Sequence, residues 1–398
     1  MPNIQIINND LIYVGASDRK LALFENVYPI PRGVSYNSYL LLDEKSALLD
    51  SADSSVYAQF IENVAAALDG RPLDYLVVNH MEPDHAATLQ EVLLRHPETT
   101  VITTAKAVQM MEQFFGSKPA KLQLVKEGDS LSLGKHQLVF TMAPMVHWPE
   151  VMMTYDATDK VLFSADAFGT FGALSGNLYA DEVNFEQEWL DDARRYFTNI
   201  VGKYGLQVQN VLKKAASLDI RMICPLHGPV WRENLDWFIG KYDVWSRYEP
   251  EEKAVVVIYA SIYGHTEAAA MSLASLLAQR GVKGIKAYDA SHTHTSYLLS
   301  ECFRASHVVL ASSTYNNGLF TPMENLLADL KAHCWQRRIV ALVENGSWAP
   351  QAAKLMRAEL EQMKDIAIVG DAISLKSAMQ PSQEEQLAAM ADALVATM

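Results

Sequence analysis

The sequence predicts an α/β protein of two domains, in which a mixed α/β sandwich precedes a doubly wound parallel sheet of five strands. A polar, charged segment with a proline at residues 246–253 is the best linker candidate. Before it, strand-like runs mix with helical stretches and with polar loops at strand ends. After it, apolar strand-like runs alternate regularly with helical patterns. We place the domains at residues 1–249 and 250–398.

Composition narrows the class of protein. The 398-residue chain is 49% hydrophobic and carries a formal net charge of −14, so it can bury more than one core. Nucleic-acid affinity depends largely on Lys and Arg, and the negative charge therefore argues against nucleic acid as a partner. The first twenty residues lack an apolar signal region, and no stretch approaches about 20 apolar residues. We expect a cytoplasmic protein without a membrane span.

The cysteines are widely spaced and form no CxxC pair: they are Cys224, Cys302 and Cys334. Neither a disulfide framework nor an internal iron–sulfur or rubredoxin-type centre is therefore expected. Any thiolate-bound redox centre must sit on another protein.

The first domain begins with a pattern of short strands. Alternating apolar residues predict a hairpin from residues 38–42 and 47–50, and the amphipathic stretch 56–68 predicts a helix. Residues 73–78 form an apolar run that leads into a histidine-rich loop. Further strands are expected between residues 101 and 153, and a helical pattern covers residues 186–212.

The second domain repeats a strand-then-helix pattern five times. Strand-like runs occupy residues 254–260, 284–290, 307–312, 338–344 and 367–375, and each precedes a helical pattern. Such repetition predicts a parallel sheet with helices on both faces, whose ligand lies beyond the carboxyl ends of the strands.

Four side chains of metal-ligand type fall within six residues directly after the apolar run 73–78: His80, Glu82, Asp84 and His85. Alternation along an extended backbone sends the first three to one side, and His85 opens a helix that begins at the next residue. These four side chains are expected to converge.

Three further candidates, His147, Asp166 and His227, each follow an apolar strand-like run. Any one of them alone is more often a hydrogen-bonded loop residue. Seven grouped carboxylates and imidazoles repel or desolvate one another unless a cation holds them. The sequence therefore predicts a metal site.

The pattern His80-x-Glu82-x-Asp84-His85, followed by the three distant ligands, resembles the metallo-β-lactamase superfamily. Hydrolases of that superfamily usually have histidine where Glu82 stands. A carboxylate in place of an imidazole makes a harder, more anionic site, which suits iron better than zinc. The glutamate form is similar to the flavodiiron branch of the superfamily.

This resemblance implies a metallo-β-lactamase-like αββα sandwich that binds two iron ions. In some members of the flavodiiron family the histidine that matches His85 turns away from the metal, so its role stays open. The resemblance assigns the ligands as follows: His80, Glu82 and His147 to one iron, Asp84, His85 and His227 to the other, and Asp166 as the bridge.

A candidate phosphate loop follows the first strand of the second domain and consists of Ser261, Ile262, Tyr263, Gly264, His265 and Thr266. Hydroxyl groups, a glycine and a following helix N-terminus favour a phosphate monoester, although helix capping would also explain these residues. There is no dinucleotide or nucleoside triphosphate motif. The loop is similar in position to the phosphate loop of flavodoxins, which implies a flavodoxin-like fold.

Two more loops lie at the ends of the third and fourth strands. They combine small, polar and aromatic residues, which suit a flat ring that needs hydrogen bonds at its edge and stacking on its face. Both resemble the loops that hold isoalloxazine in flavodoxins, so we expect FMN there. The residues are Ser313, Thr314, Tyr315, Asn316, Asn317 and Gly318 in one loop, and Asn345, Gly346, Ser347 and Trp348 in the other.

A flavin beside a metal site suggests electron flow from FMN to the metal. Reduced FMN and a diferrous pair each store two electrons, which together suffice to convert dioxygen to water; two nitric oxide molecules need only two. The predicted function is that of a flavodiiron oxidoreductase, reducing dioxygen to water and/or nitric oxide to nitrous oxide. The alternatives are a binuclear zinc hydrolase with an appended flavodoxin domain and a non-enzymatic electron-transfer flavoprotein.

The resemblance also implies partners. The expected electron donor is a rubredoxin or a similar small protein. The expected assembly is a head-to-tail homodimer, alone or paired into a dimer of dimers, in which the flavin of one chain meets the iron pair of the other. Trp348 is a candidate for the residue between flavin and iron, and Tyr179 is a candidate for lining the substrate pocket.

Overall fold

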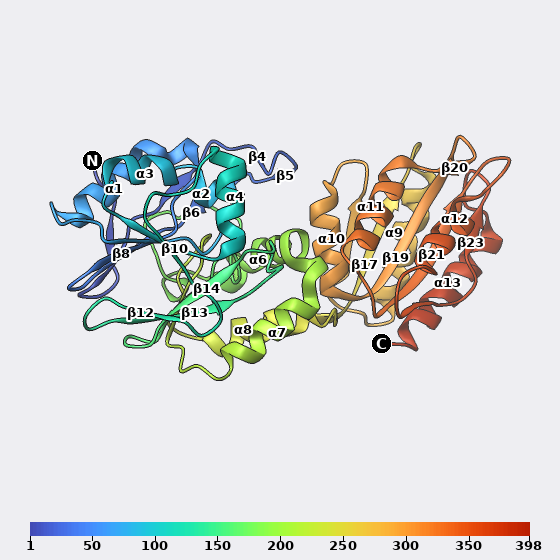
Figure 1. Ribbon diagram of the computed structural model, residues 1–398. Helices are drawn as coiled ribbons and strands as arrows, with labels where there is room; N and C mark the ends of the chain where they lie inside the picture. Colours follow the sequence, from blue (N-terminus) through green and yellow to red (C-terminus); the bar gives the residue numbers. More distant parts are fainter. The chain divides into compact units, whose positions relative to one another are not determined.

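The computed structural model describes residues 1–398, which divide into two compact units (Figure 1). The first unit comprises residues 1–197 and 206–243, and the second comprises residues 198–205 and 244–398. Helix α8 (Leu235–Ser246) ends and strand β17 (Glu252–Ala260) begins within the predicted linker. We propose residue 249 as the last residue of the first domain.

The first unit contains two main sheets and two small strand pairs. Tyr39 of the first sheet packs against Phe163 of the second, with 5.5 Å between ring centroids, so the two sheets share one core. The larger sheet has the strand order β1 (Gln5–Ile6), β2 (Leu11–Tyr13), β7 (Tyr39–Leu42), β8 (Ser46–Leu49), β9 (Tyr75–Val77), β10 (Thr100–Thr103) and β11 (Leu122–Leu124). The smaller sheet has the order β12 (Ser130–Ser132), β13 (Gln137–Met142), β14 (Met152–Asp156), β15 (Val161–Phe163) and β16 (Met222–Cys224).

Helices cover the outer sides of these sheets, with α1 and α3 on one side and α7 and α8 on the other (Figure 1). Two small strand pairs, β3 (Ala16–Asp18) with β6 (Val34–Tyr36) and β4 (Leu23–Phe24) with β5 (Tyr28–Pro29), precede the main strands. This is the predicted α/β sandwich. The remaining helices are α1 (Tyr57–Leu68), α2 (Pro83–Ala86), α3 (Leu89–Arg95), α4 (Ala105–Phe115), α5 (Phe185–Glu188), α6 (Leu190–Tyr196) and α7 (Gly205–Ala215).

The predicted hairpin (β7–β8) and the predicted first helix (α1) are confirmed. The predicted helical pattern at 186–212 is confirmed, but it is divided among α5, α6, α7 and two short turns. The chain there leaves helical geometry at Trp189, where φ is −125°, and forms a π-helical turn at Phe197–Val201 and a 3₁₀ turn at Gly202–Tyr204 between α6 and α7. Two glycines with low helix propensity, Gly202 and Gly205, occur at this second break.

The second unit is a doubly wound sheet in the order β18 (Lys286–Asp289), β17, β19 (Ala305–Tyr315), β21 (Arg338–Asn345) and β22 (Ile366–Ile368), all paired in parallel. The first strand in the sequence is therefore second in the sheet, as the prediction of a doubly wound fold requires. Two short strands, β20 (Gly318–Leu319) and β23 (Ile373–Leu375), pair with β19 and β21. The helices are α9 (His265–Gln279), α10 (Thr295–Arg304), α11 (Thr321–Ala332), α12 (Ala352–Leu360) and α13 (Pro381–Val395).

Alternation along β17 gives this sheet two buried faces. Val255 and Val257 pack into the cluster that holds Leu273 of α9 and Leu387 of α13, whereas Val256 and Ile258 pack into the opposite cluster. A continuous apolar run is therefore buried on both sides, as expected for a parallel strand.

No helix of the chain has the length and apolar character that a membrane span requires.

The fifth predicted strand, residues 367–375, is two strands rather than one. β22 pairs with the first half of β21 and β23 with its second half. Gly370 lies between them with φ of +68°, a backbone conformation that L side chains rarely adopt. The chain bends there and re-enters the sheet.

A buried guanidinium group in the second unit links the start of β21 to the end of α10 and to the segment before β17. Arg338 is 2% exposed and donates hydrogen bonds to the carbonyls of Cys302 and Phe303, in the last turn of α10, and to the carbonyl of Tyr248. The C-terminal end of a helix attracts a positive charge. Burial nevertheless lowers the pKa of Arg338 to about 9, which shows how fully it is desolvated.

We expect Arg338→Met to destabilise the second unit by about 3 kcal/mol, because the variant leaves several buried carbonyls without donors. For a domain of this size the unfolding midpoint should fall by roughly 10 °C. The adjacent Arg337, whose side chain is 45% exposed, provides the control as Arg337→Met. Calorimetry of the full chain checks both variants, and equal midpoints for them would contradict the role of Arg338.

Candidate metal centre and flavin pocket

Five of the seven predicted metal ligands lie on loops at strand ends in the first unit, and the other two, Asp84 and His85, lie in the short helix α2. The loop after β9 carries His80 and Glu82, and the loops after β13, β15 and β16 carry one ligand each. All seven residues are buried, with exposures between 0% and 9%. The structure brings together His80, Glu82, Asp84, His85, His147, Asp166 and His227.

A buried hydrogen-bond network anchors the loop after β9. Asp50 accepts hydrogen bonds from the backbone and side-chain amides of Asn79, both at 2.7 Å, and from the backbone amide of His80 at 3.2 Å. The Asn79 side-chain oxygen in turn accepts from Thr154 on β14. Burial raises the pKa of Asp50 to about 6, and the hydrogen bonds from Asn79 oppose that shift. The network therefore holds the backbone at the start of the loop that carries His80 and Glu82.

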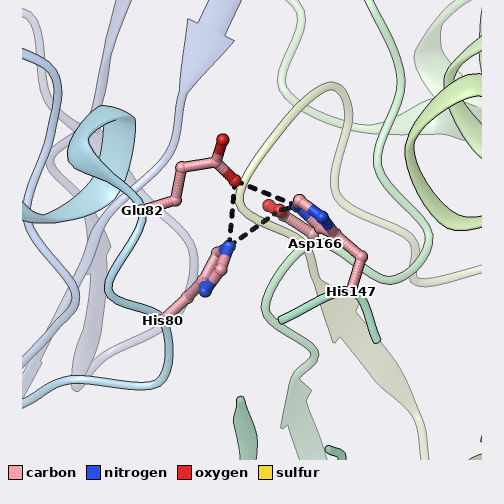
Figure 2. Close-up of side chains that lie close together, drawn as sticks. All are labelled: His80, Glu82, His147 and Asp166. Atoms are coloured by element: carbon pink, nitrogen blue, oxygen red, sulfur yellow. Dashed lines mark hydrogen bonds and ion pairs between the residues drawn. The ribbon is translucent and has the colours of Figure 1, made fainter. Parts of the chain in front are cut away.

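Four of the ligands form one group, shown in Figure 2. The Glu82 Oε2 atom lies 3.2 Å from His80 Nε2 and 3.0 Å from His147 Nε2. The Asp166 Oδ2 atom lies 3.3 Å and 2.9 Å from the same two nitrogens. Two imidazole nitrogens and two carboxylate oxygens thus face one small volume.

The other ligands form a second group beside the first. The Asp84 Oδ2 atom lies 3.2 Å from both His85 Nε2 and His227 Nε2. The second carboxylate oxygen of Asp166, Oδ1, lies 3.2 Å and 3.5 Å from these nitrogens. Asp166 therefore presents one oxygen to each group, as expected for a bridging carboxylate.

The extended alternation predicted through Asp84 is wrong, and so is the start of the helix at Ala86. Helix α2 begins at Pro83, whose fixed φ suits the first helical position, so Asp84 is already helical. This early turn moves Asp84 away from the side occupied by His80 and Glu82. It is the local reason why the motif divides into two groups.

The chemistry of the cluster fits metal cations. Both oxygens of Asp84 and the Oδ1 atom of Asp166 are buried without a hydrogen-bond partner, an arrangement that is costly unless a cation compensates it. Burial opposes a charged imidazole, yet Asp84 and Asp166 raise the pKa of His85 to about 10. Likewise Asp166 and Glu82 raise the pKa of His147 to about 9. The carboxylates thus attract positive charge to this volume.

Two neighbours of the cluster were missed by the sequence analysis. Tyr196, the last residue of α6, is fully buried; its ring centroid lies 5.4 Å from that of His227, and its hydroxyl has no hydrogen-bond partner. Burial and then the charges of Asp166 and Asp84 raise its pKa. Glu25 lies at the turn of the β4–β5 hairpin, where burial and its contact with Glu82 raise its pKa to about 8. Neither residue belongs to a sequence motif.

Tyr179, predicted to line the substrate pocket, has a different environment. The Arg232 guanidinium lies 3.5 Å from the centroid of its ring, and Arg232 also pairs with Asp181. The ring interaction of Tyr179 is with Arg232 and not with a metal ligand. A role for Tyr179 in lining the substrate pocket stays a prediction.

The predicted flavin loops converge in the second unit. A cavity of about 760 Å³ opens beyond the carboxyl ends of β17, β19 and β21. Gly264 and Gly318 do not line it, whereas Ala349 and Ser377 do. Ser377 follows β23 and forms hydrogen bonds with Ser347 and Asn345, but it belongs to none of the three loops that the sequence analysis selected. The lining comprises Ser261, Ile262, Tyr263, His265, Thr266, Ser313, Thr314, Tyr315, Asn316, Asn317, Asn345, Gly346, Ser347, Trp348, Ala349 and Ser377.

Known proteins share both halves of this architecture. Residues 34–228 match the family described as ODP family beta lactamase, and residues 257–370 match the flavodoxin family. An uncharacterized protein of Methanocaldococcus jannaschii is 33% identical over 81% of this chain and 80% of its own length. The anaerobic nitric oxide reductase flavorubredoxin of Klebsiella pneumoniae is 29% identical over 89% of this chain and 74% of its own length.

Solved structures agree over nearly the whole chain. The rubredoxin oxygen:oxidoreductase of Desulfovibrio gigas has a TM-score of 0.92 and 28% identity, covering 99% of this chain and 98% of its own. The flavodiiron protein of Giardia intestinalis has a TM-score of 0.92 and 26% identity, covering 100% and 98%. This chain belongs to the flavodiiron protein family.

Membership confirms the predicted metallo-β-lactamase-like and flavodoxin-like folds and the oxidoreductase class. FMN and a diiron centre are the cofactors of flavodiiron proteins, and this chain has a cavity and a ligand cluster that suit them. The zinc hydrolase and the non-enzymatic flavoprotein are thereby disfavoured.

Proposed function

We propose that this flavodiiron protein reduces dioxygen to water, nitric oxide to nitrous oxide, or both, and that electrons reach the metal pair through FMN. The observation that carries this proposal is the double cluster bridged by Asp166, with Glu82 in place of the imidazole of the hydrolases. Bound there, two irons would supply electrons and open coordination positions for a diatomic molecule. The chain's own residues hold the metals, exclude water and donate protons.

We propose that His80, Glu82 and His147 bind one iron, that Asp84, His85 and His227 bind the other, and that Asp166 bridges them. The bridging assignment is supported by the two Asp166 oxygens, each within 3.5 Å of a different imidazole pair. The role of His85 has weaker support, because its Nδ1 atom is buried without a partner and leaves the ring less restrained.

The Tyr196 hydroxyl is the proposed hydrogen-bond donor to the bound diatomic. It is buried beside His227 and lacks any protein partner, so a substrate oxygen would satisfy it. A phenol placed in this way stabilises negative charge that develops on the substrate.

Tyr196→Phe should therefore lower turnover by about tenfold to hundredfold, with iron and FMN contents unchanged. Steady-state consumption of each gas provides the measurement. The matched control is Tyr155→Phe, because that hydroxyl donates to the carbonyl of Asp219 on the far side of the smaller sheet. Equal turnover of the two variants would remove Tyr196 from the reaction.

The exposed aromatic residues around the flavin cavity support the head-to-tail homodimer. Tyr263 is 90% exposed and Trp348 is 88% exposed, which is unusual for large apolar side chains beside a cofactor cavity. In the proposed dimer Trp348 lies between the flavin of one chain and the iron pair of its partner. Activity should then fall as dilution dissociates the dimer, and sedimentation at the assay concentration checks this.

The proposed donor is a rubredoxin or a similar small protein, and the proposed location is the cytoplasm. The relative from D. gigas is named for rubredoxin, and the K. pneumoniae relative is named a flavorubredoxin. Two of the three cysteines of this chain, Cys224 and Cys302, are buried, so they offer no external thiolate centre. Steady-state rates with both gases and one reduced rubredoxin test the proposal; no consumption of either gas would refute it.

A further inference from the structure

The four imidazoles of the cluster differ in what their Nδ1 atoms contact, and His147 makes its hydrogen bond through Nε2 alone. The Nδ1–H group of His80 donates to Glu150 Oε1 at 2.8 Å, and that of His227 donates to the Ser35 carbonyl at 2.7 Å. The Nδ1 atom of His85 is buried and has no partner. Metal-binding imidazoles usually donate this second N–H group, which fixes the ring and raises its basicity.

Glu150 is itself rigidly held. It is 2% exposed, and its Oε1 atom also accepts a hydrogen bond from the Met81 backbone amide at 2.9 Å. Its backbone carbonyl accepts from the Thr104 hydroxyl at 3.2 Å. Both the carboxylate and the main chain are therefore fixed, and Trp148 packs edge-on against the His80 ring at 5.5 Å.

The Glu150–His80 pair permits one arrangement of the imidazole proton. A carboxylate accepts hydrogen bonds only, so the proton must lie on His80 Nδ1, and the Nε2 lone pair must face Glu82 and Asp166. The Glu150 Oε2 atom is buried without a hydrogen-bond partner. The carboxylate therefore depends on the Met81 amide and on His80, and a neutral acceptor would bind the imidazole less strongly.

We propose that Glu150 is a positioning residue that fixes the Nδ1–H tautomer of His80. As a result, the metal position formed by His80, Glu82 and His147 binds its metal more tightly than the other position does. The proposal rests on the ligand assignment under Proposed function. Each position has one imidazole whose Nδ1–H group is held by the protein, but His80 donates to a carboxylate and His227 to a neutral carbonyl. The position of Asp84, His85 and His227 therefore releases its metal first.

Glu150→Gln tests the proposal, because it keeps the side-chain volume and removes the charge. The matched control is Asp156→Asn, since Asp156 accepts from His136 Nδ1 at the same 2.8 Å in the same domain but holds no metal ligand. The full chain with FMN is titrated with an iron chelator while iron per chain is counted. The wild type and Asp156→Asn should lose iron in two steps, and Glu150→Gln should weaken the tighter step by about tenfold to hundredfold.

A second measurement does not depend on whether the variant folds. In zinc-loaded wild-type protein, proton NMR with labelled histidine should show a slowly exchanging Nδ1–H proton on His80. Its absence, or unchanged iron affinity in Glu150→Gln, or equal weakening of both steps, would overturn the proposal. A wild type that binds fewer than two irons per chain would overturn the ligand assignment itself, and the Glu150 proposal with it.

Discussion

Asp166→Ala should remove at least one iron per chain and lower the consumption of dioxygen or nitric oxide by at least about a thousandfold. This is the largest effect expected of any single substitution. Each oxygen of Asp166 faces a different pair of imidazoles, so its loss removes a ligand from both positions at once. Two cations held close together without a bridging anion also repel each other.

The control for this variant is Asp156→Ala, which removes a carboxylate that is also buried beside an imidazole in the smaller sheet. That variant should keep two irons, and any loss of stability it shows measures the cost of a buried carboxylate–imidazole pair. Iron analysis and calorimetry of both proteins separate metal loss from unfolding. Two irons retained in Asp166→Ala would show that Asp166 is not the bridge.

The second large effect is expected at the phosphate loop of the flavin cavity. The double variant Ser261→Ala with Thr266→Val should weaken FMN binding at least about a hundredfold. At each position the doubly charged phosphate of FMN loses a hydroxyl hydrogen-bond donor. The Thr266 hydroxyl forms a hydrogen bond of 2.9 Å with the Ser313 hydroxyl, and the Ser261 hydroxyl accepts a hydrogen bond of 3.0 Å from the backbone amide of Gly264. Both hydroxyls are thus already positioned at the N-terminus of α9, where an anion is favoured.

Fluorescence titration of the flavin-free protein with FMN measures this affinity. The iron content of the double variant should remain at two per chain, which distinguishes flavin loss from general misfolding. Ser275→Ala on the same helix is the control, since its hydroxyl donates only to the Met271 carbonyl. Unchanged FMN affinity in the double variant would place the phosphate elsewhere.

The metal ligands could be predicted from the sequence because strand ends are recognisable. Apolar runs mark the buried strands, and polar residues directly after them mark the loops where ligands gather. His147, Asp166 and His227 lie far apart in the sequence and come together because β13, β15 and β16 belong to one sheet. The division into two metal groups was not predictable from alternation, because Pro83 starts a helix inside the motif.

The residues missed by the sequence analysis are placed by tertiary packing alone. Tyr196 ends a helix that was predicted to continue, Glu25 lies in a hairpin turn, and Glu150 occurs in a loop whose course depends on β14. None of them stands at a diagnostic spacing from a ligand. Ser377 lies two residues after the strand end predicted at residue 375, and it was missed because the loop after that strand carries no recognisable motif.

The most direct test of the account is a single turnover by protein that carries two irons and one FMN per chain. The fully reduced dimer, holding four electrons per chain, is mixed without further donor with one dioxygen or four nitric oxide molecules per chain. We expect consumption of one dioxygen per chain to water without hydrogen peroxide, or of four nitric oxide molecules to two nitrous oxide, with both flavin and iron oxidised. Oxidation of the flavin alone, or release of hydrogen peroxide from dioxygen, would contradict the proposed transfer of electrons from FMN to a diiron centre.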